Sequence, residues 1–234
     1  MIDSTGFADA ALALSSADSS DAELCGAFVT WFGSAAAAVS TLGHPLGSEI
    51  VCATDAHAAQ LDEIQLDLGE GPCWEALATG RPVLEPDLQN GQRTTWPLAR
   101  DALQKTVIGA VFAFPLVVAG INVGAVDLYS PTARKMSRPQ VREATLLSSI
   151  LARQVLRRAL RAAKRPEDDD GAWESEFSRR EVHQATGMVL AQMGISAEDA
   201  LLVLRGHAFA TGRPARDVAT DVIDRKLDFT EPTD

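Results

Sequence analysis

The sequence contains little cysteine: Cys25, Cys52 and Cys73 are its three residues of this type, widely spaced in a chain of 234 residues. Their odd number and the absence of a CxxC motif argue against a disulfide framework and against a cysteine-rich zinc site. A reduced, cytoplasmic compartment fits this cysteine usage best. The first 24 residues are acidic and lack a basic segment, so they make a poor secretory signal.

An unbroken hydrophobic run that could form a membrane helix is also missing. Residues 107–126 carry no charge, and about twenty uncharged residues are enough to span a bilayer. However, this stretch is interrupted by five residues that break helices, namely Gly109, Pro115, Gly120, Asn122 and Gly124. We therefore expect two strands around a tight turn at Ala119 and Gly120, and no membrane as a partner.

The charge balance excludes a general electrostatic attraction of the whole chain to polyanions. The formal net charge is −11, so any contact with nucleic acid or with anionic lipid has to be local. The hydrophobic fraction of 46% and the charged fraction of 23% are typical of a globular protein with a sizeable core.

Catalytic signatures are absent too: the chain has no GxxxxGK(S/T) loop, no GxSxG elbow and no HExxH helix. The segment GEGP at residues 69–72 lacks the lysine of a phosphate-binding loop, so we interpret it as a turn that borders a pocket. Cys73 has no identifiable base, which favours a structural or redox-sensitive role. His183 and His207 lack an obvious third ligand. We therefore expect that the protein is not an enzyme and that it binds no metal and no cofactor.

The chain divides best at residues 164–173, where proline, glycine and four consecutive acids separate two helical patterns. Before this boundary, short strand patterns occur at residues 36–43, 49–54 and 82–86, and short helical patterns at 55–66, 73–80 and 96–106. Together with the later hairpin, this order predicts an α/β (α+β) fold, with helices beside an antiparallel or mixed sheet.

One long helix is predicted over residues 138–165, with Ser137 as its N-cap. From Arg134 to Arg165 there are ten basic residues and one acid, Glu143. An apolar stripe recurs every four residues, at Leu147, Leu151 and Val155. The basic side is a solvated face, the outer side of a dimerising helix, or a surface that contacts phosphates. We favour a dimerising signalling helix.

Residues 21–163 resemble a GAF domain, a module that senses small molecules. The resemblance rests on LDLGEGPCWEALATGRPVLEPDL, the later FAFPLVVAGINVGAVDLYS and the helix after it. It implies an antiparallel sheet with flanking helices and a pocket for a small-molecule ligand. Phe112 and Phe114 alternate in a strand, so they share one face, in the core or at the pocket. The candidate pocket residues are Gly69, Glu70, Gly71, Cys73, Trp74, Phe112 and Phe114.

Residues 178–229 resemble an ANTAR domain, a three-helix RNA-binding module of transcription antitermination. The ordered motifs are QATGM, LRGHA, RP and VA. Thr186 stands where many relatives carry lysine, which leaves a phosphate contact there open, and an actinobacterial GAF–ANTAR branch is similar in having HQATGM. The resemblance implies RNA-binding residues at Arg180, His183, Gln184, Thr186, Gly187, Arg205 and Arg213.

Between Glu174 and Asp228 there are seven basic and nine acidic residues. Neutralisation of phosphates by this segment alone gives weak binding, so we expect local recognition of unstacked loop bases. A homodimer would add avidity by joining two such modules.

The first C-terminal helix, predicted over residues 174–193, contains a glycine in its middle. Its inward stripe is predicted to consist of Val182, Ala185, Val189 and Met193. His183, Gln184, Thr186 and Gly187 then lie on one outward, small and polar face. Because glycine costs up to about 1 kcal/mol against alanine inside a helix, we expect another helix or an RNA backbone to approach Gly187 closely.

These inferences predict a flexible N-terminus (1–20), a sensory domain (21–163), an acidic linker (164–173), an RNA-binding domain (174–229) and a tail (230–234). In this hypothesis a ligand or partner alters the sensory domain, the long helix transmits the change, and the C-terminal module binds stem-loops in nascent transcripts. The alternatives are an enzyme with a helical appendage, an adaptor whose helices bind protein, and a DNA-binding protein. Three aspartates in the third predicted helix suit a DNA groove badly.

Overall fold

A computed structural model describes residues 4–16, 20–33, 36–43, 46–91, 95–162 and 179–230. It divides into two compact units, Met1–Ser178 and Arg179–Asp234. The predicted acidic linker at 164–173, the start of the predicted helix at 174–178 and most of the tail, 231–234, lie outside the described residues.

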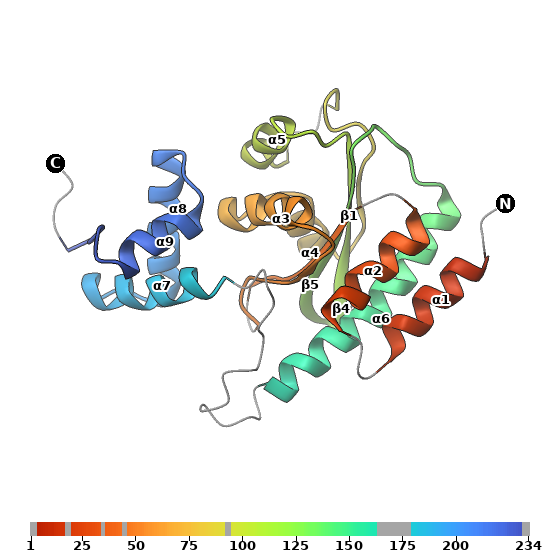
Figure 1. Cartoon of the computed structure of the whole chain (residues 1–234), viewed down its shortest axis with the longest axis horizontal. Coiled ribbons are helices and arrows are strands. Elements are labelled where there is room, and N and C mark those ends of the chain that lie inside the picture. The colour runs from red at the N-terminus through yellow and green to blue at the C-terminus, as the bar shows by residue number, and fades with distance from the viewer. Residues whose placement is uncertain are drawn as a thin grey trace. The chain divides into compact units, whose positions relative to one another are not determined.

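An antiparallel sheet of five strands forms the centre of the first unit, in the order β2-β1-β5-β4-β3 (Figure 1). The strands are β1 (Ala36–Thr41), β2 (Glu49–Ala53), β3 (Val83–Glu85), β4 (Ala110–Val118) and β5 (Ile121–Ser130). Strands β4 and β5 form the predicted hairpin. Ala119 and Gly120 have positive φ values of 49° and 83°, as a two-residue hairpin turn of matching twist requires.

Helices cover both faces of this sheet (Figure 1). One face is covered by α1 (Ser4–Ser15), α2 (Asp21–Phe32) and α6 (Arg138–Ala162). The other face is covered by α3 (Ala56–Leu68), α4 (Pro72–Thr79) and α5 (Pro97–Gln104). Successive side chains of β4 alternate between the two cores, because Phe112 belongs to the first and Val111 to the second. Two buried faces explain why the central strands are almost continuously apolar.

The prediction of a flexible N-terminus is wrong for Ser4–Ser15, which form α1. Ala10 and Leu14 are buried in the core, and Phe7 packs against it, so apolar residues recur at helical spacing. The side-chain nitrogen Nε2 of Gln154 on α6 donates a hydrogen bond to the backbone oxygen of Ser16 at 2.9 Å. The alanines of this segment favour a helix. A segment rich in alanine and serine also resembles a linker, which is why a flexible N-terminus was expected.

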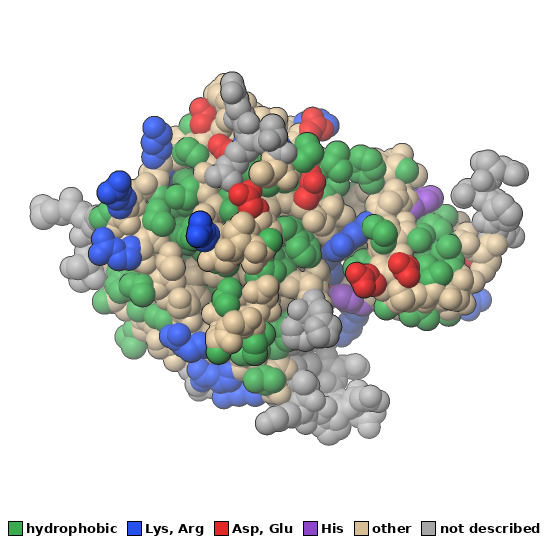
Figure 2. All heavy atoms as spheres, turned by 180° about the vertical axis from the view of Figure 1, so that it is seen from behind, with side chains coloured by type: hydrophobic (Ala, Val, Ile, Leu, Met, Phe, Trp, Pro, Cys, Tyr) green, Lys and Arg blue, Asp and Glu red, His purple; other side chains and the backbone are tan. Residues whose placement is uncertain are grey.

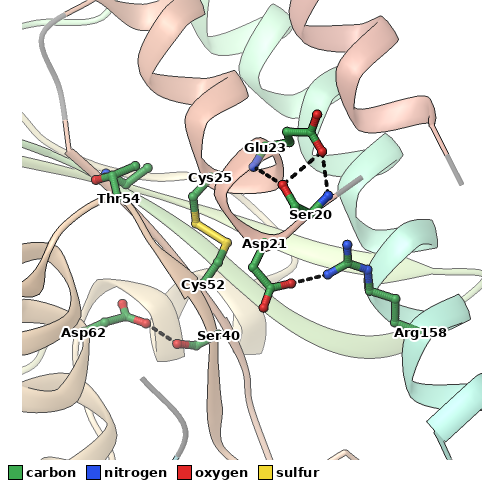
Figure 3. Close-up of a disulfide and its surroundings, with 10 residues drawn as sticks. Ser20, Asp21, Glu23, Cys25, Ser40, Cys52, Thr54, Asp62 and Arg158 are labelled. Atoms are coloured by element: carbon green, nitrogen blue, oxygen red, sulfur yellow. Dashed lines mark hydrogen bonds and ion pairs between the residues drawn. A yellow bond between two sulfur atoms is a disulfide. The ribbon is translucent and has the colours of Figure 1, made fainter. Parts of the chain in front are cut away.

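A disulfide joins Cys25 on α2 to Cys52 on β2, with the two Cα atoms 6.1 Å apart (Figure 3). The argument against a disulfide is therefore wrong for this pair, and the cysteine usage does not support the reduced compartment that was predicted from it. Their separation of 27 residues gives no hint of pairing, which depends on α2 lying against β2. Cys73 is free and buried. Figure 3 also shows the ion pair between Asp21 and Arg158, which connects α2 to α6.

Ser137 caps α6, as predicted. The backbone N–H of Gln140 donates to Ser137 Oγ at 3.4 Å, and the backbone N–H of Ser137 donates to Gln140 Oε1 at 2.9 Å. The predicted apolar stripe is fully buried in the core beside the sheet, at Leu147, Leu151 and Val155. This stripe is therefore used inside the unit and is not available as a dimer seam.

The second unit is a bundle of three helices, as predicted: α7 (Arg180–Met193), α8 (Ala197–Thr211) and α9 (Ala215–Ile223). Ser196 caps α8 by accepting a hydrogen bond from the backbone N–H of Asp199 at 3.1 Å. Gly194 and Gly212 end α7 and α8 in the left-handed conformation, with φ of 67° and 64°. The bundle has its own core of small and branched side chains, centred on Val182, Leu204 and Val218.

Within the described part of the chain, no single helix has the length and apolar character needed to cross a membrane. Helices α7 and α8 meet that criterion only as a pair, with a bend of 106° between them.

Candidate functional site

A cluster of buried polar side chains lies between the sheet and α3. Asp62 and Gln65 are one turn apart on α3, so they share its inner side. Asp127 and Tyr129 are two residues apart on β5, so they point to the same face of the sheet. Each of the four is at most 2% exposed. Ser40 on β1 lies beside them, because its hydroxyl donates to Asp62 Oδ2.

The side chains of this cluster are joined by a network of hydrogen bonds. The amide nitrogen of Gln65 donates to Asp127 Oδ2 and to the Tyr129 hydroxyl, the latter at 2.9 Å. The Tyr129 hydroxyl lies 3.1 Å from Asp62 Oδ1, to which it can donate its proton. Gln65 therefore connects two carboxyl groups and a phenol, so its amide is the centre of the network.

Burial raises the pKa of Asp127 well above its ordinary value, and the negative charge of Asp62 raises it further. The pKa of Tyr129 is raised by the same two effects, burial first and then the charge of Asp62. Asp127 is therefore the carboxyl of the pair that holds a proton. Its Oδ1 atom is buried and has no hydrogen-bond partner within the described residues. An unpartnered buried oxygen is costly, which marks this atom as the open position of the network.

The loop predicted to border a pocket closes over Gln65. Gly71 has φ of 138°, and a Cβ atom there would come within 2.6 Å of Gln65 Oε1, so only glycine fits. The backbone N–H of Cys73 donates to Gln65 Oε1 at 3.0 Å, and Trp74 Nε1 donates to the backbone oxygen of Gln65 at 2.9 Å. The structure thus brings three predicted pocket residues, Gly71, Cys73 and Trp74, to the buried polar cluster.

Two further predicted pocket residues, Gly69 and Glu70, have structural roles in this loop. Gly69 ends α3 in the left-handed conformation, with φ of 65°. The Glu70 carboxylate accepts hydrogen bonds from the backbone N–H groups of Leu98 and Ala99 at the start of α5. It therefore satisfies the first turn of α5 and suits the positive end of that helix. Burial is the largest cause that raises the pKa of the Cys73 thiol well above its ordinary value, so Cys73 is a poor nucleophile.

Phe112 and Phe114 do not lie with the other predicted pocket residues. They share one face, as predicted, but it is the face covered by α2 and α6. Val111 and Ala113 are the β4 residues on the side of α3 and α4. Alternation along a strand tells which residues share a face, but it does not tell which face the pocket uses. Phe112 and Phe114 are therefore core residues of the opposite layer.

Four residues of the cluster were not predicted from the sequence: Asp62, Gln65, Asp127 and Tyr129. The available signal was the segment GAVDLYS, where an aspartate and the chain's single tyrosine interrupt an apolar strand. A buried polar residue is more informative than a buried apolar one, because its burial costs free energy unless it is paired.

In the second unit, Arg180, His183, Gln184 and Gly187 are exposed on one side of α7. At about 100° per residue they lie within an arc of about 100°. Thr186 does not belong to this face, contrary to prediction. It is 9% exposed and its hydroxyl donates to the backbone oxygen of Val182 at 2.6 Å.

The surroundings of Gly187 show whether another helix of the bundle approaches it closely, which was one of the two alternatives predicted for this glycine. No atom outside its own stretch of helix would lie within 4 Å of a Cβ at this position. Close packing by another helix of the bundle is therefore excluded among the described residues. Of the predicted inward residues, Val182, Ala185 and Val189 are buried, but Met193 is 42% exposed, because it is the last residue of α7.

The two remaining predicted arginines lie on other elements of the bundle. Arg205 is partly buried on α8. Arg213 lies between α8 and α9, and its Nη2 atom is 2.7 Å from Asp221 Oδ2. Arg213 must therefore release Asp221 before it can bind a phosphate. The ring of His207 contacts Phe229 edge-on, and no described group of three or more metal-ligating side chains is placed to hold an ion.

Comparison with known proteins relates both units to known domain families. The sequence profile of the GAF domain family matches residues 22–155, more than half of the chain. The chain belongs to the GAF domain family. The profile of the ANTAR domain matches residues 177–223, which include α7, α8 and α9. A comparison with curated protein sequences found no match.

Solved GAF domains have the same fold as the first unit. The GAF domain of a phosphoenolpyruvate-protein phosphotransferase from Coxiella burnetii is similar with a TM-score of 0.54 and 10% identity, over 69% of this chain and 99% of that one. The corresponding domain from Acinetobacter is similar with a TM-score of 0.52 and 11% identity, over 70% and 96% of the two chains. At these identities the likeness concerns the fold alone.

GAF and ANTAR are regulatory domains, and their combination is that of a sensory domain which controls an ANTAR output. The buried polar cluster lies inside the GAF match, and the exposed face of α7 lies inside the ANTAR match.

Proposed function

We propose that this protein is a cytoplasmic, RNA-binding regulator of transcription antitermination. Its ANTAR domain binds stem-loops in nascent transcripts and so prevents a terminator from forming. The observation that carries the proposal is the exposed face of α7, which lies within the residues that match the ANTAR family. The proposed RNA-binding residues on this face are Arg180, His183, Gln184 and Gly187.

The chemistry of this face suits RNA loops. A guanidinium, an imidazole and an amide can form hydrogen bonds with phosphates and with the edges of unstacked bases. The absence of a side chain at Gly187, with no atom near its Cβ position, allows an RNA backbone to approach α7. Arg205 and Arg213 remain proposed contacts from neighbouring elements. Two copies of the chain in a homodimer present two such faces, which gives avidity for paired stem-loops.

The proposed sensory site is the buried polar cluster of the GAF domain, bordered by Gly71, Cys73 and Trp74. A small molecule with hydrogen-bond donors would satisfy the unpartnered Oδ1 atom of Asp127. Such a ligand controls the ANTAR domain only if it binds one arrangement of the protein better than another. The loop from Gly69 to Trp74 is the proposed part that rearranges, because hydrogen bonds to Gln65 and to the start of α5 hold it in place, and a ligand can replace them.

A second candidate function, binding of a protein by the C-terminal helices, is favoured by two side chains of α8. Leu202 is 67% exposed and Phe209 is 59% exposed. They are seven residues apart, so they lie on the same side of the helix. A protein partner that covers this side would make the chain an adaptor.

The test is to crosslink the full-length protein in cells and to sequence the RNA, the DNA and the proteins recovered with it. We expect a small set of transcripts enriched above background, each with a pair of stem-loops before a terminator. Recovery of no transcript above background, or of duplex DNA alone, would overturn the proposal. Recovery of one protein without RNA would support the adaptor instead.

A further inference from the structure

The outer side of α6 carries arginines without acidic partners. Arg138, Arg142, Arg153 and Arg157 are exposed on this helix. At about 100° and 1.5 Å per residue, they lie within an arc of about 100° and extend over about 28 Å. We call these four residues the α6 arginine face. Among the described residues, none of the four has an ion-pair partner.

The face lies opposite the helix's own apolar stripe. Leu147, Leu151 and Val155 are buried in the core, about half a turn away from the arginines. The one acid of α6, Glu143, lies off the arginine face, and its Oε2 atom accepts a hydrogen bond from Trp31 Nε1 at 2.8 Å. Figure 2 shows Lys and Arg side chains gathered along the left and lower left of the larger unit, where α6 runs in that view.

The charge of this face contrasts with the charge of the chain. The whole protein has a formal net charge of −11, so four unpaired arginines in one row are a local exception. A second copy of the same helix fits the face badly, because like charges would meet along its length. A partner with regularly spaced negative charges fits it well, and the phosphates of a nucleic acid provide them.

We propose that the α6 arginine face is a second RNA contact, which binds phosphates of the transcript held by the ANTAR domain. This inference rests on the proposed function. It also supplies what the ANTAR domain lacks, because residues 174–228 contain seven basic and nine acidic residues. The ANTAR domain reads the loops, and the arginine face contributes affinity that does not depend on sequence.

The salt dependence of RNA affinity distinguishes a phosphate contact from a structural role. Each phosphate contact contributes about 0.7 to 0.9 to the slope of log affinity against log salt concentration. The double variant Arg153→Gln/Arg157→Gln should therefore lower that slope by about 1.4 to 1.8. Between 50 and 200 mM salt, the affinity of the unchanged protein should fall about 7- to 12-fold more than that of the variant. Adding Arg138→Gln and Arg142→Gln should about double the change in slope.

The probe is an RNA selected from a random pool on the immobilised full-length protein, kept at its selected length. The matched control is Arg81→Gln/Lys105→Gln, which removes two exposed positive charges from other parts of the same unit. The control should keep the slope of the unchanged protein. All variants should keep its thermal midpoint, because the substituted side chains are exposed.

The outcomes separate the inference from the proposed function. Selection of an RNA with equal slopes for all variants would overturn the inference and leave the RNA-binding function standing. Failure to select any RNA would overturn both. Loss of flotation with phosphatidylglycerol vesicles in the α6 variants, with an unchanged RNA slope, would assign the face to a membrane surface and would also overturn the inference.

Discussion

The side chain of Gln65 holds the backbone of Cys73: its Oε1 atom accepts a hydrogen bond from the Cys73 N–H at 3.0 Å. The amide nitrogen of the same side chain donates to the Tyr129 hydroxyl at 2.9 Å and to Asp127. Gln65 thus connects the loop after α3 to the sheet. Because all these groups are buried, each hydrogen bond that is lost leaves a polar group unsatisfied.

The first prediction concerns Gln65→Ala. The substitution removes the partner of the Cys73 N–H and the donor to Asp127, and each buried group left unsatisfied costs about 1–3 kcal/mol. We expect a loss of about 2–5 kcal/mol in the free energy of unfolding, measured by urea titration. Gln60→Ala is the matched control, because Gln60 is exposed on the same helix. Equal midpoints for the two variants would show that the network does not stabilise the domain.

The second prediction concerns pH and Asp127. Its pKa in the folded protein is raised well above the ordinary value of 3.8, first by burial and then by the charge of Asp62. Above pH 3.8 the unfolded chain ionises this carboxyl while the folded protein keeps it protonated. The contribution of Asp127 to stability is therefore fully present below that pH and is lost as the pH rises through the folded-state pKa.

Asp127→Asn removes this titration and keeps a neutral polar group of similar size. Relative to the unchanged protein, the variant should gain stability as the pH is raised from 4 towards 8, measured as the free energy of unfolding in urea. Asp101→Asn is the control, since Asp101 is exposed on α5. Curves of unfolding free energy against pH that run parallel for Asp127→Asn and the unchanged protein would contradict a raised pKa.

The third prediction concerns the disulfide between Cys25 and Cys52. A cross-link over 27 residues restricts the unfolded chain, which corresponds to about 3–4 kcal/mol by loop-closure entropy. Treatment with a phosphine reductant should therefore lower the urea midpoint. The double variant Cys25→Ala/Cys52→Ala should show no response to the reductant. A midpoint of the unchanged protein that is insensitive to reductant, with Cys25 and Cys52 both detected as free thiols by mass spectrometry beforehand, would show that the bond does not form.

Local patterns allowed much of the fold to be predicted from the sequence. The hairpin of β4 and β5, the cap at Ser137 and the three C-terminal helices depend on turns, caps and periodicity, which involve residues close in sequence. The disulfide and the exclusion of Phe112 from the predicted pocket depend on which layer covers which face of the sheet. That information lies in contacts between distant segments, and one sequence does not contain it in readable form.

In the candidate sites, too, local patterns predicted some residues, whereas others depend on contacts between distant segments. The loop residues Gly71, Cys73 and Trp74 were predictable because glycine and proline mark the turn. The polar partners Asp62 on α3 and Asp127 on β5 were not, because an aspartate is usually a solvated residue. Thr186 was assigned to the outer face of α7 because threonine is polar, yet its hydroxyl is satisfied by the backbone oxygen of Val182, so it can be buried.

The fourth prediction concerns Gly187, for which α8 offers an internal control. Gly187 on α7 and Gly206 on α8 are both exposed inside a helix, and at neither position would an added Cβ have an atom within 4 Å from outside its own stretch of helix. Alanine at either position should therefore stabilise the protein by up to about 1 kcal/mol, measured by urea titration. Only Gly187→Ala should weaken RNA binding, because its methyl group would stand where the RNA backbone approaches α7.

Comparison of these two variants separates a folding effect from a binding effect. Both gain the same helix propensity, so a loss of RNA affinity confined to Gly187→Ala cannot come from altered stability. The affinity is measured by fluorescence anisotropy with RNA selected on the full-length protein. If both variants bind RNA as the unchanged protein does, the glycine of α7 has no part in recognition, and RNA contacts on α7 are limited to its longer side chains.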